Sequence, residues 1–164
     1  MRVKTIIFLT LAVCISKVND VNGQSNISYV DSIKRYTKFV DSLVSSFYSN
    51  PQTRLGHSIT HFTCISRKGG ASIDLYEGSE GKVYQLMYYT NCDTPGVEKT
   101  YYFLNRKIVC ASVVESPFGV MKRRTKFYQN DRLILSDSSW IKKRKQRFDK
   151  DLKEGYELLE RSKT

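Results

Sequence analysis

TYYFLNRKIVCAS, residues 100–112, and TKFYQNDRLILSD, residues 125–137, repeat one pattern. In both copies an aromatic residue, one further residue and an asparagine precede a basic residue and two apolar ones. Asn105-Arg106 and Asn130-Asp131 each separate two apolar runs, and asparagine tolerates the positive φ that a two-residue hairpin turn requires. The pattern therefore predicts one β-hairpin, used twice to extend an antiparallel sheet.

These turns also predict the strand register, because residues equally distant from a two-residue turn face each other. The stretch LYEGSEGKVY, residues 75–84, is a looser third copy with a longer turn. The expected cross-strand pairs are Phe103 with Ile108 and Tyr101 with Cys110 in the first copy, and Tyr128 with Leu133 and Lys126 with Leu135 in the second.

Short runs of β-branched and aromatic residues, separated by turn residues, continue from residue 57 to residue 137. Consecutive strands joined by tight turns pair with each other, so these runs predict an antiparallel β-meander of six or seven strands. The expected strands lie near residues 58–66, 71–77, 82–90, 99–104, 107–115, 121–129 and 132–137.

An amphipathic helix is predicted on each side of the meander. Over residues 27–49, apolar residues recur at three- and four-residue steps, with Ser28 and Asp31 as a capping signal and Asn50-Pro51 as the stop. Over residues 138–161, apolar residues recur at nearly heptad spacing. Both segments are long enough to cover one face of a sheet.

The expected fold class is α+β, with both helices packed on one face of the sheet. The other face would then carry tyrosines such as Tyr84, Tyr88 and Tyr102. Gly155, in the middle of the second helix, lowers helix stability by up to about 1 kcal/mol relative to alanine.

Residues 1–23 have the features of a secretory signal peptide. A positive N-terminus precedes an apolar run at residues 6–15, which is too short to cross a bilayer. Cleavage is expected between Gly23 and Gln24, and an uncleaved N-terminal anchor is the alternative. Residues 24–164 are expected to form one domain with no transmembrane segment, exported to the periplasm or secreted.

The chain is strongly basic, with 27 lysine and arginine residues against 16 aspartate and glutamate residues. Loss of Arg2, Lys4, Lys17 and Asp20 with the signal leaves 24 against 15, a net charge of +9. A basic exported surface is compatible with polyanions such as nucleic acid, anionic lipid or acidic polysaccharide, and does not discriminate among them.

Three cysteines remain after cleavage, Cys64, Cys92 and Cys110. An odd number permits at most one internal disulfide, and the spacing does not choose among the three pairings. Buried thiols and a single disulfide are both compatible with the sequence. Cys110 lies in an apolar strand, which raises a thiol pKa, so Cys92 is the more reactive candidate. No cysteine or histidine cluster has zinc spacing, and neither a metal nor a cofactor is expected.

The hairpin pattern YYFLNRKIV followed by FYQNDRLI resembles one found in small exported proteins of Bacteroidetes-type bacteria. In those proteins an aromatic pair, one residue, an asparagine, a basic residue and an apolar pair recur along a β-meander. The end of the export signal, VNGQ, is also similar. Proteins with MORN-type repeats are a more distant likeness, because their glycine-rich period is not kept. The resemblance covers about residues 72–137, implies export and a β-meander, and implies no catalytic residues.

His57 and His61 are the only histidines and the first candidates for catalysis. Two histidines can serve as acid and base in a ribonuclease-type reaction, with a lysine such as Lys68 stabilising the developing charge. In an extended strand, however, they lie about 13 Å apart on one face, too far to flank one phosphate. Structural histidines are therefore the preferred interpretation. Carboxylates such as Asp149 and Asp151, among the lysines of the last helix, indicate a solvated face.

Two basic runs give the strongest surface signal, KRRTK at residues 122–126 and KKRKQR at residues 142–147. Cations at the start of a helix oppose its dipole, so the second run indicates a role other than stability. Phe127, Tyr128 and Trp140 are near enough in sequence to stack with a bound polyanion. A solvated basic face is the alternative. The candidate binding residues are Lys122, Arg123, Arg124, Lys126, Lys142, Lys143, Arg144, Lys145 and Arg147.

The sequence favours a non-enzymatic exported protein that binds a partner through its sheet or its basic face. One alternative is an enzyme that acts on a polyanion, such as an extracellular ribonuclease using His57, His61 and Lys68. Another is a peripheral protein held at an anionic membrane surface by its basic helix.

Overall fold

The computed structural model describes residues 3–50, 55–64, 69–92, 96–116, 121–137 and 149–163, with side chains described from residue 26 onward. Its elements are, in chain order, α1 (Val3–Ser49), β1 (Gly56–Thr63), β2 (Gly70–Glu77), the short 3-10 helix η1 (Ser79–Gly81), β3 (Val83–Thr90), β4 (Val97–Leu104), β5 (Lys107–Glu115), β6 (Lys122–Gln129), β7 (Arg132–Asp137) and α2 (Lys150–Arg161).

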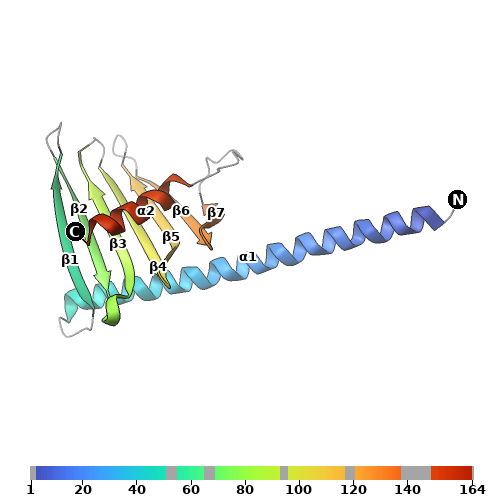
Figure 1. Ribbon diagram of the computed structural model, residues 1–164, viewed down its shortest axis with the longest axis horizontal. Coiled ribbons are helices and arrows are strands. Elements are labelled where there is room, and N and C mark those ends of the chain that lie inside the picture. The colour runs from blue at the N-terminus through green and yellow to red at the C-terminus, as the bar shows by residue number, and fades with distance from the viewer. Residues whose placement is uncertain are drawn as a thin grey trace.

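The seven strands form one antiparallel sheet in which the spatial order follows the chain from β1 to β7 (Figure 1). This confirms the predicted α+β class and the β-meander. Short turns suffice because they can join antiparallel neighbours, whereas parallel strands would need long crossovers. The order also places β1 and β7 at the two edges of the sheet.

Two-residue turns join β4 to β5 and β6 to β7, as the repeat predicts. The φ values are 52° and 63° at Asn105 and Arg106, and 50° and 62° at Asn130 and Asp131. Positive φ at both central residues gives the turn whose twist matches that of the flanking strands. The predicted pairs Phe103 with Ile108 and Tyr128 with Leu133 are present, one position outside the pairs that flank each turn.

One position beyond that pair, the predicted register of the first hairpin is wrong. Cys110 faces Tyr102, not Tyr101, because Val109 is an extra residue on its strand. Such a bulge places two successive residues on the same side of the sheet. Val109 and Cys110 accordingly belong to the same core cluster.

The other two copies of the hairpin contain the same bulge. In the second copy Lys126 faces Ser136 instead of the expected Leu135, and Ile134 is the extra residue. In the third copy, between β2 and β3, Tyr84 is the extra residue. The repeat therefore specifies a turn and a bulge together, and a strict alternation of faces cannot predict the bulge.

The two helices pack on opposite faces of the sheet, which corrects the expectation that they share one (Figure 1). The physical reason lies in the strands, since β4 has consecutive buried residues and so needs cover on both sides. The core on the α1 face contains Val30, Ile33, Val40 and Val44 of the helix with Tyr76, Tyr102 and Phe127 of the sheet. The core on the α2 face contains Leu158 and Leu159 of the helix with Ile73, Leu86, Tyr101 and Phe103 of the sheet.

The tyrosines expected on a free face pack beneath the helices instead. Tyr84 and Tyr102 lie against the α1 cluster, and Tyr88 lies against the α2 cluster. A phenol ring covers a large apolar area while its hydroxyl reaches a polar partner. Tyr102, for example, donates a hydrogen bond to Asp41 Oδ1 at 2.9 Å.

The helix ends differ from the predicted ends at both N-termini. α1 begins at Val3 instead of residue 27, and Ser28 lies inside it, with its carbonyl accepting a bond from the Ser32 hydroxyl. The chain has no proline before Pro51, so no residue of this helix-breaking type separates residues 3–26 from the predicted helix. α2 begins at Lys150 instead of residue 138, and residues 138–148 lie outside the described residues.

Gly155 has a packing role that helix propensity does not reveal. A Cβ atom at this position would lie 2.6 Å from Tyr101 Cδ1 and 2.7 Å from Ile108 Cδ1. The missing side chain lets α2 approach the sheet closely. The conformational cost of glycine in a helix is thus offset by tertiary contact.

Candidate functional site

The two histidines lie on β1 and do not converge. His57 stacks on Tyr76 with ring centroids 4.5 Å apart and planes 9° from parallel. Its Nε2 atom is 3.6 Å from Asp74 Oδ1. His61 is exposed four positions further along the strand, about 13 Å away on the same face. Lys68 lies outside the described residues, so the ribonuclease-type trio is not assembled within them.

The basic run on β6 is only partly available to a ligand. Lys122 and Arg123 are exposed, whereas Arg124 is half-buried and donates a hydrogen bond to Glu115 Oε1 at 2.8 Å. Outside the described residues lie Trp140, Lys142, Lys143, Arg144, Lys145 and Arg147.

Lys126 is not on the surface, which corrects its assignment to the basic face. The side chain is 8% exposed, and its Nζ atom lies 2.7 Å from Asp149 Oδ2 and 2.7 Å from Asp151 Oδ2. Both aspartates are buried as well, so they are not part of a solvated face. Phe127 and Tyr128 are buried on opposite faces and cannot stack with a polyanion.

This buried network holds the start of α2 against β6. Asp149 is the N-cap of α2, accepting from the Asp151 backbone N–H at 3.0 Å and from the Tyr128 hydroxyl at 3.0 Å. Burial alone would raise the pKa of Asp149, but the hydrogen bonds and charge of Lys126, with the other two donors, lower it overall. Burial first, and the Asp149 carboxylate second, raise the pKa of Tyr128. The network is structural, because its groups are closed to solvent.

A groove of about 390 Å³ runs between α2 and strands β3 and β4. Its charged lining consists of the cations Lys99, Lys150, Lys153 and Arg161 and the carboxylates Glu154 and Glu157. Lys99 Nζ lies 2.6 and 2.7 Å from the two carboxylate oxygens of Glu154, and Lys153 Nζ lies 3.5 Å from Glu157 Oε1. These two carboxylates lower the net positive charge of the groove and so weaken its attraction for a polyanion.

Three further features bear on the kind of site that this chain can offer. Burial, followed by the charge of Asp41, raises the pKa of the free Cys110 thiol to about 12. A thiol in that state is a poor nucleophile at neutral pH. Among the described residues, no group of histidine, cysteine and carboxylate side chains could hold a metal ion. None of the described helices has an apolar stretch long enough to cross a membrane.

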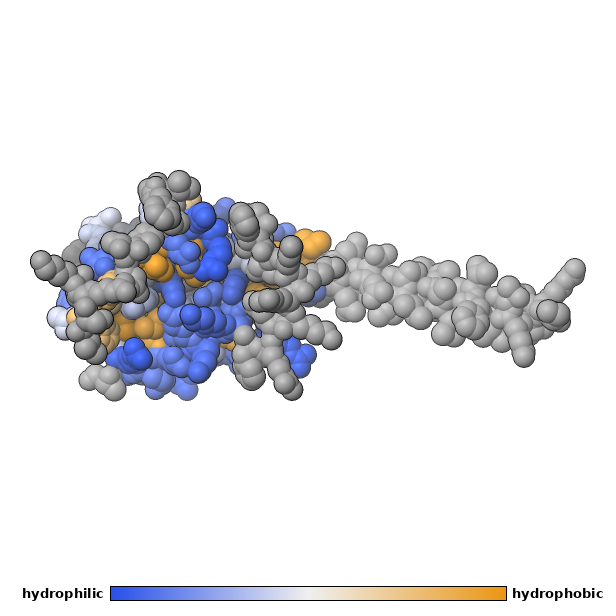
Figure 2. Space-filling view, turned by 90° about the horizontal axis from the view of Figure 1, so that it is seen from above, coloured by the Kyte–Doolittle hydropathy of each residue, from blue (hydrophilic) through white to orange (hydrophobic). Residues whose placement is uncertain are grey.

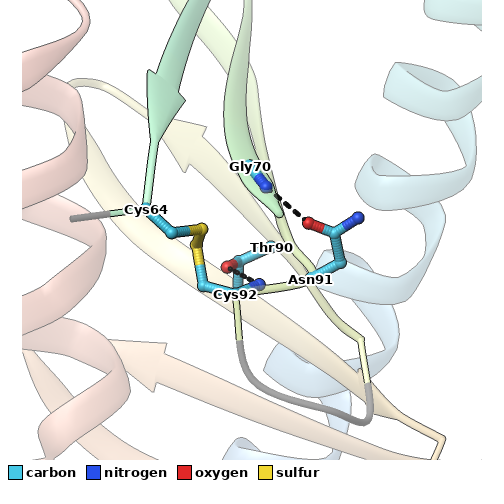
Figure 3. The surroundings of a disulfide bond; sticks show 5 residues. All are labelled: Cys64, Gly70, Thr90, Asn91 and Cys92. Atoms are coloured by element: carbon cyan, nitrogen blue, oxygen red, sulfur yellow. Dashed lines mark hydrogen bonds between the residues drawn. A yellow bond between two sulfur atoms is a disulfide. The ribbon is translucent and has the colours of Figure 1, made fainter. Parts of the chain in front are cut away.

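Cys64 and Cys92 form a disulfide, with Cα atoms 5.7 Å apart (Figure 3). This resolves the pairing that the sequence left open and removes Cys92 as a reactive thiol. The bond joins the residues that follow β1 and β3, with the start of β2 between them. There the Gly70 N–H donates to Asn91 Oδ1 at 2.6 Å. Gly69 has φ 139°, and a Cβ atom on it would lie 2.8 Å from the Asn91 carbonyl oxygen.

The other end of β1 is held by aromatic contacts. The ring of His57 stacks on Tyr76 and meets the rings of Phe47 and Tyr48 edge-on, with centroids 5.6 and 6.2 Å away. The Tyr48 and Tyr76 hydroxyls also form a hydrogen bond. β1 is therefore fixed at both ends, by the aromatic cluster at its start and by the disulfide after its end.

β1 presents an open and uncharged edge. Within the described sheet it pairs only with β2, over eight residues and without a bulge. Its sequence, GHSITHFT, contains no aspartate, glutamate, lysine or arginine. Ile59 is 50% exposed and Phe62 is 38% exposed, and Tyr48, whose ring meets that of His57, is 66% exposed. Figure 2 shows hydrophobic surface toward the end of the molecule where β1 lies, and hydrophilic surface over its middle.

β7, at the opposite edge, has the features that protect an edge strand. It is six residues long, contains the bulged Ile134, and begins and ends with the charged residues Arg132 and Asp137. Short length, a bulge and charge each disfavour pairing with another chain. β7 also exposes Leu133 and Leu135, so the two edges differ in length, regularity and charge and not in exposed apolar side chains.

β1 was not among the predicted sites, although the sequence contains a signal for it. The first strand of a meander must be an edge strand, and residues 56–63 stand out by their lack of charge. Comparison of the chain with models of protein families, with curated proteins and with solved structures found no match. Function is therefore inferred from the geometry of this chain.

Proposed function

We propose that this protein is an exported, non-enzymatic interaction module that binds an extended polypeptide segment along β1. The observation that carries the proposal is the open, uncharged and bulge-free edge of this strand. The backbone N–H and C=O groups that point away from β2 are suited to pair with an added strand. Strand addition satisfies these groups and extends the existing hydrogen-bond ladder.

The exposed side chains of β1 would give the added strand contacts on both faces. Because side chains alternate along a strand, Ile59 shares the α1 face with His57, and Phe62 lies on the α2 face. An added strand with β-branched or aromatic residues on both sides would bury these two groups. A charged strand would gain no ion pair from β1 itself.

The two clamps at the ends of β1 favour binding because they hold the strand in the geometry that a partner needs. A free edge strand would lose conformational entropy on binding, and a strand already ordered avoids most of that cost. The aromatic cluster at His57 and the Cys64–Cys92 disulfide supply this order. Export is part of the proposal, since residues 1–23 have signal features and disulfides persist in oxidising compartments.

The alternatives have less support from the described residues. A ribonuclease would need His57, His61 and Lys68 in one cleft, and the two histidines lie about 13 Å apart along β1. In the basic run on β6, Lys122 and Arg123 are exposed to a polyanion or an anionic membrane. Lys126 is not, because it is paired in the buried network.

The test uses a fluorescent peptide with the sequence of residues 56–63 and purified residues 24–164 at low protein concentration. Binding followed by fluorescence anisotropy should be saturable. It should weaken by about tenfold or more in the double variant Ile59→Lys with Phe62→Lys, because charge on an edge opposes pairing. The matched control, Leu133→Lys with Leu135→Lys, changes exposed residues of β7 and should leave binding unchanged. Equal losses of peptide binding in the two variants would contradict the proposal. Absence of peptide binding by the natural chain would contradict it as well.

A further inference from the structure

We infer that the strand accepted by β1 is the β1 strand of a second copy of this chain, so that two sheets join edge to edge in a two-fold symmetric dimer. The inference rests on the proposed function, because it names the partner of the same edge. Three features of the described residues support a second copy over another polypeptide.

The first feature is charge. Each copy carries a net charge of +9 after signal cleavage, so two copies repel each other at most points of contact. Of the two edge strands, β1 is the one without a charged residue, so two copies can approach along it without placing cation against cation. The chemistry that β1 demands of a partner, an uncharged strand rich in β-branched and aromatic residues, is its own chemistry.

The second feature is symmetry. Antiparallel pairing of a strand with its own copy generates a two-fold axis perpendicular to the sheet, and every contact is then made twice. The axis keeps both α1 helices on one face and both α2 helices on the other. Ile59 meets the copy's residues on the α1 face, and Phe62 does so on the α2 face.

Tyr48 extends the same interface beyond the strand itself. Figure 1 shows that the C-terminal end of α1 lies beside β1, while its N-terminal part runs past β7. Tyr48, near that C-terminal end, is 66% exposed although it touches His57 and Tyr76. A large aromatic ring in this position would be covered by the second copy.

The third feature is closure. Within the part of the sheet that the structure describes, joining two β1 strands leaves only the two β7 strands as edges. Each of these is short, bulged at Ile134 and charged at Arg132 and Asp137. Because such edges resist pairing, assembly stops at two copies instead of continuing into a fibre. A head-to-tail contact between β1 and β7 would lack this property.

The test is the mass of residues 24–164 in solution, measured by sedimentation equilibrium from about 1 µM to about 200 µM. We expect a concentration-dependent dimer for the natural chain and for the β7 control Leu133→Lys with Leu135→Lys. The β1 variant Ile59→Lys with Phe62→Lys should remain a monomer. Salt should strengthen the dimer, because it screens the repulsion between like-charged copies. Binding to a polyanion would weaken with salt instead.

Amide hydrogen exchange on the natural chain makes the test independent of any variant. Amides of β1 should gain protection as the concentration rises, while those of β7 should not. A monomer at every concentration, or a dimer that persists in the β1 variant, would overturn the inference. A monomer that still binds the peptide of residues 56–63 would show that the partner of β1 is not a second copy, and it would still support the proposed function. A monomer that binds no peptide would overturn both.

Discussion

The Lys126 ammonium group lies 2.8 and 2.7 Å from the two carboxylate oxygens of Asp149, in a position closed to solvent. The contact joins a strand to the N-terminus of a helix 23 positions later in the chain. A buried charge without a partner is costly, so both residues depend on this pairing. The pair therefore determines where α2 begins on the sheet.

Replacing Asp149 with asparagine should lower the free energy of unfolding by about 2 kcal/mol. Asparagine still caps a helix, so the loss reports the missing charge and not the missing cap. Asp151 remains as a partner for Lys126, which limits the loss. Urea denaturation measures the effect. Glu160→Gln is the control, because Glu160 forms a solvent-exposed ion pair in which its Oε1 atom lies 3.9 Å from Lys163 Nζ. Equal losses in the two variants would show that the buried pair does not stabilise the fold.

Acid should destabilise this protein partly through Asp149. Its pKa is lowered in the folded state, so its contribution is fully present above the ordinary aspartate pKa of about 3.9 and is lost as the pH falls through the lower, folded value. Measured from about pH 7 to about pH 2.5, the free energy of unfolding should fall less steeply below about pH 4 in Asp149→Asn than in the natural chain. Parallel curves would rule out this linkage.

Alanine at position 155 should destabilise the fold despite its higher helix propensity. The new Cβ atom would lie 2.6 Å from Tyr101 Cδ1, and the cost of overpacking, about 1–3 kcal/mol, exceeds the gain of about 1 kcal/mol in propensity. Thermal unfolding measures the difference. Adding Ile108→Val removes the second clashing atom, Ile108 Cδ1, and should restore part of the loss. Stabilisation by Gly155→Ala alone would mean that α2 is free to move outward.

Loss of the disulfide should lower stability by about 3–4 kcal/mol, the amount expected for closing a loop whose ends are 28 positions apart. The paired variant Cys64→Ser with Cys92→Ser should also speed amide exchange at the end of β1, because the bond clips that end to β3. Exchange near His57 should change less, since the aromatic cluster remains. Uniform exchange changes along β1 would indicate that the two clamps act as one unit.

Local sequence determined the hairpins of this protein. Asn105 and Asn130 adopt the positive φ that their neighbours could not adopt as easily, and the strands on either side follow from short-range alternation. The stop of α1 at Asn50-Pro51 is equally local. Such features depend on the conformational preferences of a few adjacent residues, so the chain order of the meander and both of its edges could be predicted.

Only the tertiary structure decided what each face of the sheet meets. Whether the two helices share a face depends on packing between distant segments, and the bulges at Val109 and Ile134 move residues from one face to the other. In the sequence Lys126 is one cation of a basic run, and only the fold places Asp149 beside it. The Cys64–Cys92 bond likewise requires β1 and β3 to finish at the same end of the sheet, on either side of β2. The candidate site depends on both levels. Local sequence made β1 an uncharged edge strand. The aromatic cluster and the disulfide that fix its two ends form only when distant residues pack together.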